Sequence, residues 1–275
     1  MKTAFKILPQ LQQDGAYHLL IELGWEVVSF VYFTKDPLCI EALYIYHVPK
    51  DSSAAGMATE LEKVLENTSL PQHLSCHICY SFREHTLIPS DFIKQAERAD
   101  VLNLLFGSQH NALPFAETVE GMDLAVAHRV DKKMEALLLK YFPGAIIHHS
   151  LALQLPQWAK ESNALICTVH QQSIHVVLFK EGQLQIARSF NYSTPADVAY
   201  HLLNVCTQHE FSPESGELIL SGFIDHKSNL YDELYRYFLN IRLHEGNPAV
   251  ATSQAVSQYP AHFFSPLTQL VSCVS

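Results

Sequence analysis

Residues 164–190 read ALICTVHQQSIHVVLFKEGQLQIARSF, three short apolar runs separated by Gln171-Gln172 and by Lys180-Glu181-Gly182. Short runs of β-branched and aromatic residues between turn residues predict consecutive antiparallel strands. The Glu-Gly pair at the second break is close to the Asp-Gly dipeptide that favours a tight hairpin. The middle run, residues 174–179, is apolar on both faces apart from His175, as is typical of a covered central strand. The stretch therefore predicts a three-strand meander within a sheet.

The rest of the chain repeats this plan. A first meander is expected over residues 17–23, 26–34 and 38–48, with breaks at Gly24 and at Lys35-Asp36-Pro37. Further strands are predicted over 73–82, 122–130, 145–149, 217–220 and 241–244, with 107–121 as a loop. Helices are predicted over 51–67 (capped by Asp51-Ser52-Ser53), 89–106, 131–142, 150–162, 194–209, 229–240 and 264–274. Because both halves run meander, helix, strand, helix, the order predicts two α/β lobes, residues 1–150 and 151–275, joined by the helix near 150–162.

Composition narrows the function classes. The chain has 275 residues, a formal charge of -10 and 48% hydrophobic residues, so it is long enough to bury a substantial core. An acidic chain with a single adjacent basic pair, Lys132-Lys133, is not expected to bind nucleic acid.

Targeting signals and cysteines bear on the compartment. No secretory signal is evident at the start, and no apolar run reaches the roughly 20 residues of a membrane span. We therefore expect neither a secretory signal nor a membrane span. The six cysteines lie mostly within apolar runs, which is typical of buried free thiols in a reducing compartment. We therefore expect a cytoplasmic protein.

The order of elements resembles a known superfamily. Residues 123–154, DLAVAHRVDKKMEALLLKYFPGAIIHHSLALQ, look like the strand–helix–strand that leads into the interlobe helix of the actin-like pilus-assembly proteins. The whole chain also resembles a bacterial family of uncharacterised proteins assigned to the actin-like ATPase fold. The shared motifs are Leu87-Ile88-Pro89, Tyr141-Phe142-Pro143 with His149, Ser189-Phe190-Asn191-Tyr192 followed by Asp197 and Tyr200, Leu220-Ser221-Gly222, and Pro260-Ala261-His262-Phe263-Phe264. The resemblance implies two ribonuclease H-like lobes with mixed sheets flanked by helices, and it brings no established activity.

The same resemblance implies where a nucleotide would bind. Actin-like ATPases use an acid and a glycine at the hairpin of each meander, where backbone N–H groups approach the phosphates. The first hairpin keeps Glu22 and Gly24, whereas the second, residues 168–172 around His170, has neither an acid nor a glycine. The adenosine-side glycine pair is reduced to Ser221-Gly222. We therefore expect a degenerate site and no catalytic residue.

Other catalytic and metal sites are not favoured. His73, Cys76, His77 and Cys79 form the densest group of metal-ligand types, but an extended strand spreads the three that share a face over roughly 20 Å. His148-His149 is expected to make structural hydrogen bonds. Ser221 lacks the flanking glycines of a nucleophile elbow. A ribonuclease H-like nuclease would need several carboxylates for two metal ions, and Glu22 alone does not supply them.

Two function classes remain. The leading hypothesis is a non-catalytic protein-binding or scaffolding module with no cofactor and no bound metal. The alternative is an ATP-binding switch or weak ATPase that holds ATP and magnesium between the lobes through Glu22, Gly24, His170, Ser221 and Gly222. The segment around residues 260–264 is expected to dock its aromatic side chains against a lobe, and its use as a partner-binding peptide is the minority interpretation.

Overall fold

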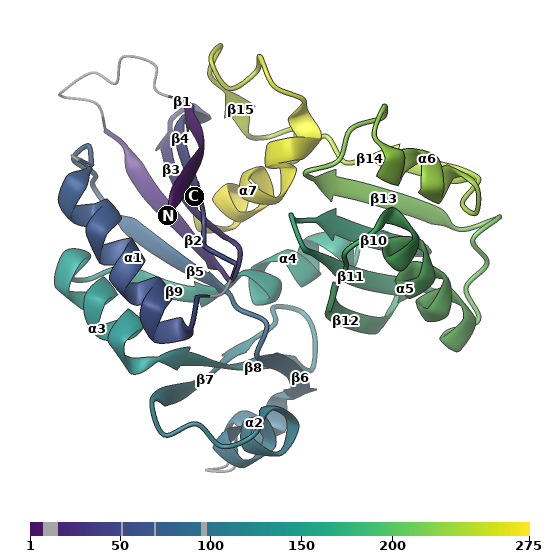
Figure 1. The fold of residues 1–275 in the computed structure, drawn as a ribbon, viewed down its shortest axis with the longest axis horizontal. Coiled ribbons are helices and arrows are strands. Elements are labelled where there is room, and N and C mark those ends of the chain that lie inside the picture. The colour runs from purple at the N-terminus through teal and green to yellow at the C-terminus, as the bar shows by residue number, and fades with distance from the viewer. Residues whose placement is uncertain (8–15, 51, 69, 95–97) are drawn as a thin grey trace. The chain divides into compact units, whose positions relative to one another are not determined.

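The computed structural model describes residues 1–7, 16–50, 52–68, 70–94 and 98–275 (Figure 1). Its contacts divide the chain into two compact units. Unit 1 comprises Met1–Pro156, Ala249–Gln258 and Cys273–Ser275, and unit 2 comprises Gln157–Pro248 and Tyr259–Ser272. The expected lobe boundary at residue 150 lies at the first residue of α4 (Ser150–Trp158), whereas the contacts change unit after Pro156. The segment Ala249–Gln258, which the prediction placed in the second lobe, returns to unit 1.

Unit 1 is built on a seven-stranded sheet. Its strands are β1 (Lys2–Ile7), β2 (His18–Gly24), β3 (Val27–Lys35), β4 (Leu38–His47), β5 (Cys76–Ser81), β9 (Ile146–His149) and β15 (Ala251–Thr252). They lie in the order β1-β4-β3-β2-β5-β9, with β15 beside β4. The predicted meander β2-β3-β4 is confirmed as antiparallel, and β5 and β9 extend it in parallel. β1 and β15 were not predicted.

Helices α1 (Ala54–Asn67) and α3 (Lys132–Tyr141) pack against this sheet (Figure 1). Alternate residues of β2, namely Leu19, Ile21 and Leu23, enter the core cluster that these helices cover. The helix side of the cluster consists of Met57, Ala58, Leu61, Leu65, Met134, Leu137 and Leu138. Ser53 caps α1 by accepting a hydrogen bond from the backbone of Gly56 at 3.1 Å. Asp51, which was expected to share this cap, lies outside the described residues.

A small antiparallel sheet belongs to the same unit. It has the order β6 (His85–Pro89), β8 (Leu124–Asp131), β7 (Ala112–Thr118) and carries a 3-10 turn (Ser90–Lys94) and α2 (Arg98–Phe106). The single helix predicted over 89–106 is therefore wrong in its first half, and residues 95–97 lie outside the described part. The predicted loop over 107–121 is also wrong, since it contains β7. The β7 sequence ALPFAET has little intrinsic strand propensity, so its conformation follows from pairing with β8.

Unit 2 repeats the topology of the first sheet. Its strands are β10 (Ala164–Val169), β11 (Ser173–Lys180), β12 (Gln183–Asn191), β13 (Glu217–Gly222) and β14 (Asn240–Leu243), in the order β12-β11-β10-β13-β14. This order matches β4-β3-β2-β5-β9 strand for strand. The predicted duplication of the plan is thus confirmed at the level of sheet topology.

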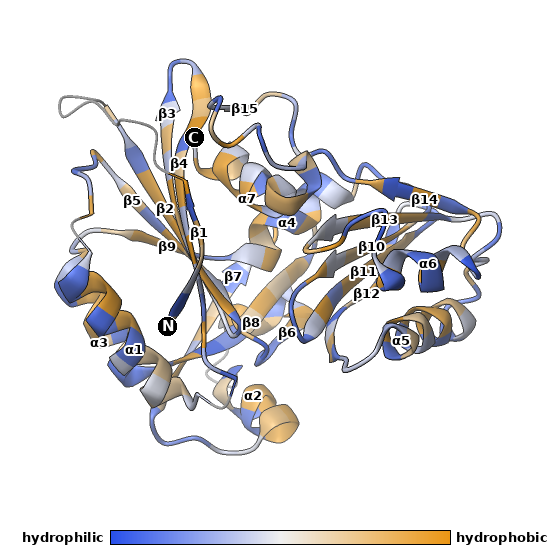
Figure 2. Cartoon of the chain, turned by 45° about the horizontal axis from the view of Figure 1, so that its top comes forward, coloured by the Kyte–Doolittle hydropathy of each residue, from blue (hydrophilic) through white to orange (hydrophobic). Residues whose placement is uncertain are grey.

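The helices of unit 2 are α5 (Pro195–Gln208), α6 (Asn229–Tyr235) and most of α7 (Ala261–Val274). Thr194 and Asp197 form the capping box that starts α5, and this helix has both apolar and polar residues around its axis (Figure 2). Helix α6 ends earlier than the predicted residue 240. At the start of α7, Phe264 is buried, and His262 Nε2 donates a hydrogen bond to the Ile224 carbonyl at 2.6 Å. The expected docking of this segment is confirmed.

Candidate functional site

Glu22 and Gly24 lie at the carboxyl end of β2, where the neighbouring parallel strand β5 also ends. The carboxyl ends of parallel strands are where α/β folds usually bind ligands. Here the Ser81 hydroxyl of β5 donates a hydrogen bond to the Glu22 carboxyl. Burial raises the pKa of Glu22 to about 7, and the Ser81 hydrogen bond opposes this effect only in part. The Glu22 side chain is therefore engaged within its own sheet and is partly protonated at neutral pH.

We expect the substitution Glu22→Gln to reduce the pH dependence of folding. Because the folded-state pKa is raised, the ionised form is disfavoured in the fold, and stability is lost as the pH rises from 4.5 through 7. The half-buried side chain limits the effect, so the advantage of the variant over the parent should grow by about 2 kcal/mol between pH 5 and pH 8.5. Urea unfolding at several pH values measures this difference, with exposed Glu120→Gln as the control. A pH-independent difference would contradict the prediction.

The second group, His170, Ser221 and Gly222, lies in unit 2 at the ends of β10 and β13. Ser221 Oγ hydrogen-bonds Thr168 Oγ1 across the two strands at 2.9 Å. Gly222 has a φ of +80°, and a Cβ at this position would lie 2.3 Å from the Val169 carbonyl oxygen. Glycine is thus required here because two backbones approach each other closely.

The hairpin that follows β10 is closed by Tyr192. The Tyr192 hydroxyl donates to the His170 carbonyl at 2.6 Å, and the Tyr192 backbone N–H donates to the Gln172 carbonyl at 2.9 Å. The His170 N–H donates to the Ser173 carbonyl at 2.9 Å. These bonds engage the His170 N–H together with the carbonyls of His170, Gln172 and Ser173. Three of the five predicted residues are therefore brought together in unit 2, and Glu22 and Gly24 lie together in unit 1.

The histidines and cysteines considered above as metal ligands occupy structural positions. Cys76 faces the helix-covered core of β5, and His73 precedes that strand. Within the part of the chain that the structure describes, no group of three or more His, Cys, Asp or Glu residues could hold a metal ion. His148 Nδ1 hydrogen-bonds Glu117 at 2.9 Å, and His149 Nδ1 accepts from the Leu151 N–H at 3.2 Å. These are the structural hydrogen bonds expected of the His148-His149 pair.

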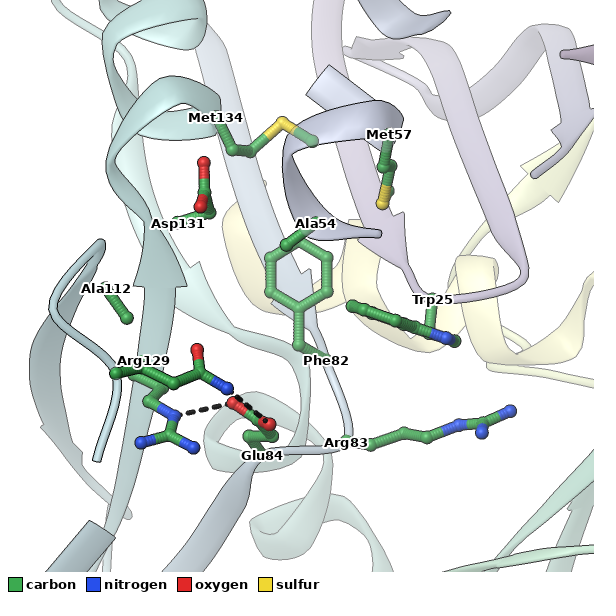
Figure 3. A pocket seen from close by; sticks show the side chains of 11 residues that line it. Trp25, Ala54, Met57, Phe82, Arg83, Glu84, Ala112, Arg129, Asp131 and Met134 are labelled. Carbon is green, nitrogen blue, oxygen red and sulfur yellow. Dashed lines mark hydrogen bonds and ion pairs between the residues drawn. The ribbon is translucent and has the colours of Figure 1, made fainter. Parts of the chain in front are cut away.

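Sequence reasoning missed a pocket in unit 1 (Figure 3). It has a volume of about 210 Å³. Its lining comes from the β2–β3 turn, the start of α1, the segment after β5, the small sheet and the start of α3: Trp25, Ala54, Met57, Phe82, Arg83, Glu84, Gln109, Ala112, Arg129, Asp131 and Met134. Met57 and Met134 lie on the inner faces of their helices, but no local sequence pattern shows that five separate segments converge.

Both arginines around this pocket are paired with acids of the same unit. Arg83 pairs with Glu26 at 2.6 Å, and the buried Arg129 pairs through Nε with Glu84 at 2.5 Å. The Arg129 guanidinium also donates to the carbonyls of Gly107 and Phe106, at 2.7 and 3.0 Å.

The remaining polar groups of the lining are engaged too. Gln109 donates to Glu84 at 3.1 Å, and the Asp131 carboxylate accepts from the Lys133 N–H at the start of α3 at 2.9 Å. The pocket therefore combines an apolar floor with polar walls in which both arginines are paired and the Asp131 carboxylate is held by a backbone N–H.

Two units with the same strand order and flanking helices define a protein of the actin-like ATPase fold. The family model for DUF3822, a protein family of unknown function, matches residues 9–241, and the chain belongs to that family. A crystal structure from Bacteroides thetaiotaomicron, described as having an actin-like ATPase fold and unknown function, is 19% identical and covers 97% of this chain and 99% of its own, with a TM-score of 0.79.

Two other solved structures share the fold at lower identity. The PilM-PilN type IV pilus biogenesis complex is 15% identical over 97% of this chain and 98% of its own, with a TM-score of 0.54. The ethanolamine utilization protein EutJ from Carboxydothermus hydrogenoformans is 8% identical over 96% and 92%, with a TM-score of 0.51. No curated protein sequence matches this chain. Among the described residues, no helix is both long and apolar enough to cross a membrane.

Proposed function

We propose that this chain is a non-catalytic module of the actin-like fold that acts by binding another protein. The observation that carries the proposal is the engagement of the strand ends where a nucleotide would be held. In unit 1 the Glu22 carboxyl is bonded to Ser81. In unit 2, Gly222 packs on the Val169 backbone and Tyr192 closes the hairpin at His170. Each of these groups has an internal partner in place of a phosphate or a metal ion.

The type of partner follows from composition and from one structural neighbour. PilM, which shares the fold, was solved together with PilN, which supports a protein partner for this chain. The net charge of -10 disfavours a nucleic acid. All six cysteines are free, which supports a reducing, cytoplasmic location.

Calorimetric titration with ATP and magnesium tests the first half of the proposal. We expect no saturable heat at micromolar nucleotide and no phosphate release above background. A micromolar dissociation constant for ATP would overturn the proposal.

The second half requires a defined partner. Proteins captured from the native host would be purified and titrated into the isolated chain. A stoichiometric complex that forms without nucleotide supports the proposal, and an absolute requirement for ATP contradicts it.

An ATP-binding switch is the second candidate, and one observation favours it. Glu22 keeps an acid at the end of β2, and its pKa of about 7 is typical of functional carboxyls as well as of structural ones. If this candidate is correct, ATP with magnesium should raise the melting temperature of the parent chain and should not raise that of Glu22→Ala. An equal response of both chains would remove Glu22 from any nucleotide site.

A further inference from the structure

We propose that the pocket of unit 1 binds one bulky, uncharged side chain, phenylalanine or leucine, from a segment of a partner protein. This inference rests on the proposed function, because it names the place and the chemistry of the protein contact. Met57, Phe82 and Trp25 form one side of the pocket, and Arg129 with Glu84 forms another (Figure 3).

The size of the pocket favours a side chain over a small-molecule cofactor. Its volume of about 210 Å³ lies below the roughly 300–1,000 Å³ of most small-molecule sites. A cavity below this range suits one side chain better than a whole cofactor. Interfaces concentrate their binding energy in a few such residues, which insert into well-packed and desolvated pockets.

The chemistry of the walls selects an uncharged occupant. Met57 and Met134, which are 1% and 2% exposed, supply flexible thioethers that adapt to aromatic and aliphatic shapes. The basic groups are already paired, Arg83 with Glu26 and Arg129 with Glu84. A phosphate or carboxylate would have to compete with these acids and would also face the Asp131 carboxylate. At the glutamates a cation would have to compete with the arginines, and the Asp131 carboxylate already accepts a hydrogen bond from the Lys133 N–H. An apolar group only needs to displace water from the floor.

The chain offers a direct reporter for this contact. It has four methionines, and two of them, Met57 and Met134, line the pocket, whereas Met1 and Met122 do not. Spectra of the full chain labelled with ¹³C at the methionine methyl groups therefore contain two reporter signals and two internal controls. The probes are N-acetyl-phenylalaninamide and N-acetyl-leucinamide, compared with N-acetyl-glycinamide and phenyl phosphate.

We expect the phenylalanine and leucine probes to shift the Met57 and Met134 signals saturably, with millimolar dissociation constants, and to leave Met1 and Met122 unchanged. The glycine probe and phenyl phosphate should bind more weakly. Ala112→Phe, which fills the pocket from β7, should weaken probe binding at least about tenfold. Ala54→Phe fills it from α1, and Ala187→Phe, at a half-buried position on β12 of unit 2, is the matched control. Unshifted Met57 and Met134 signals, tighter binding of phenyl phosphate, or full binding by both filled variants would overturn the inference.

A random-peptide library selected on the parent chain separates this inference from the proposed function. Peptides that share one obligatory bulky apolar residue and lose affinity for Ala112→Phe support the pocket. Peptides that bind the parent chain and Ala112→Phe equally would overturn the pocket and leave protein binding in place. Failure of protein binding itself would appear in the titration with the purified partner.

Discussion

Replacing Arg129 with alanine is expected to lower the free energy of unfolding by about 2–4 kcal/mol. The Arg129 side chain is 5% exposed and is the group that ties strand β8 to the end of α2. Its loss would leave the carbonyls of Phe106 and Gly107 without their donor, and the Glu84 carboxylate would lose its ion pair and keep the bond from Gln109. Two carbonyls that lose their donor and a carboxylate that loses its ion pair account for the size of the effect. Urea unfolding followed by circular dichroism measures it.

The control for this substitution is a surface ion pair. Arg236 pairs with Glu233 one helical turn away, and the Arg236 side chain is 68% exposed. Arg236→Ala should therefore change the free energy of unfolding by no more than about 1 kcal/mol. Arg129→Lys keeps the positive charge without the fork of donors, so it should fall between the two. Equal effects of Arg129→Ala and Arg236→Ala would show that Arg129 does not anchor the small sheet.

Acidification from pH 7 to pH 4 is expected to unfold the protein. Burial lowers the pKa of His77, His128 and His244 to about 4 in each case. Because these folded-state pKa values lie below the ordinary value of 6.5, the neutral imidazole is favoured in the fold. The resulting stability is present above pH 6.5 and is lost as the pH falls through 4. Each histidine contributes up to about 3 kcal/mol, so the two in unit 1 together amount to a large share of the roughly 5–15 kcal/mol of one domain, and His244 acts on unit 2.

Tryptophan fluorescence can follow the acid transition in each unit separately. The chain has two tryptophans, and Trp158 lies against His244 with a ring-centroid distance of 4.6 Å in unit 2. Trp25→Phe leaves Trp158 as the reporter of unit 2. His128→Leu should shift the transition of unit 1 to lower pH, whereas the exposed His110→Leu should leave it unchanged. An unchanged transition in His128→Leu would show that protonation of this residue does not limit acid stability.

The elements that the sequence predicts well are those whose signals are local. Both meanders alternate apolar residues between turn residues, and the Thr194 capping box needs only four consecutive residues to be recognised. Strands β1, β6, β7 and β15 were missed because they exist through pairing with distant partners. Ala251 pairs with Cys39, which is far away in the sequence, and no local pattern predicts this pairing.

The candidate sites also have local features, which the sequence shows, and long-range features, which it does not. The hairpin position of Glu22 and the loss of acid and glycine around His170 were legible in the sequence. The sequence did not show how the second strand end is closed, because the Tyr192 hydroxyl reaches the His170 carbonyl across the sheet. The pocket was invisible for a related reason, because its walls come from five segments that only the folded unit 1 brings together.

The return of Ala249–Gln258 to unit 1 has a consequence for how the protein is synthesised and dissected. On the ribosome, the sheet that begins with β1 receives β15 only after all of β10–β14 has emerged. Cys273, whose thiol donates to the Leu153 carbonyl at 3.4 Å, arrives later still. The amino-terminal unit is thus the last to be completed. A fragment that ends at Pro156 would leave part of the β4 edge uncovered, so any attempt to study that unit alone should supply residues 249–258 as a separate peptide.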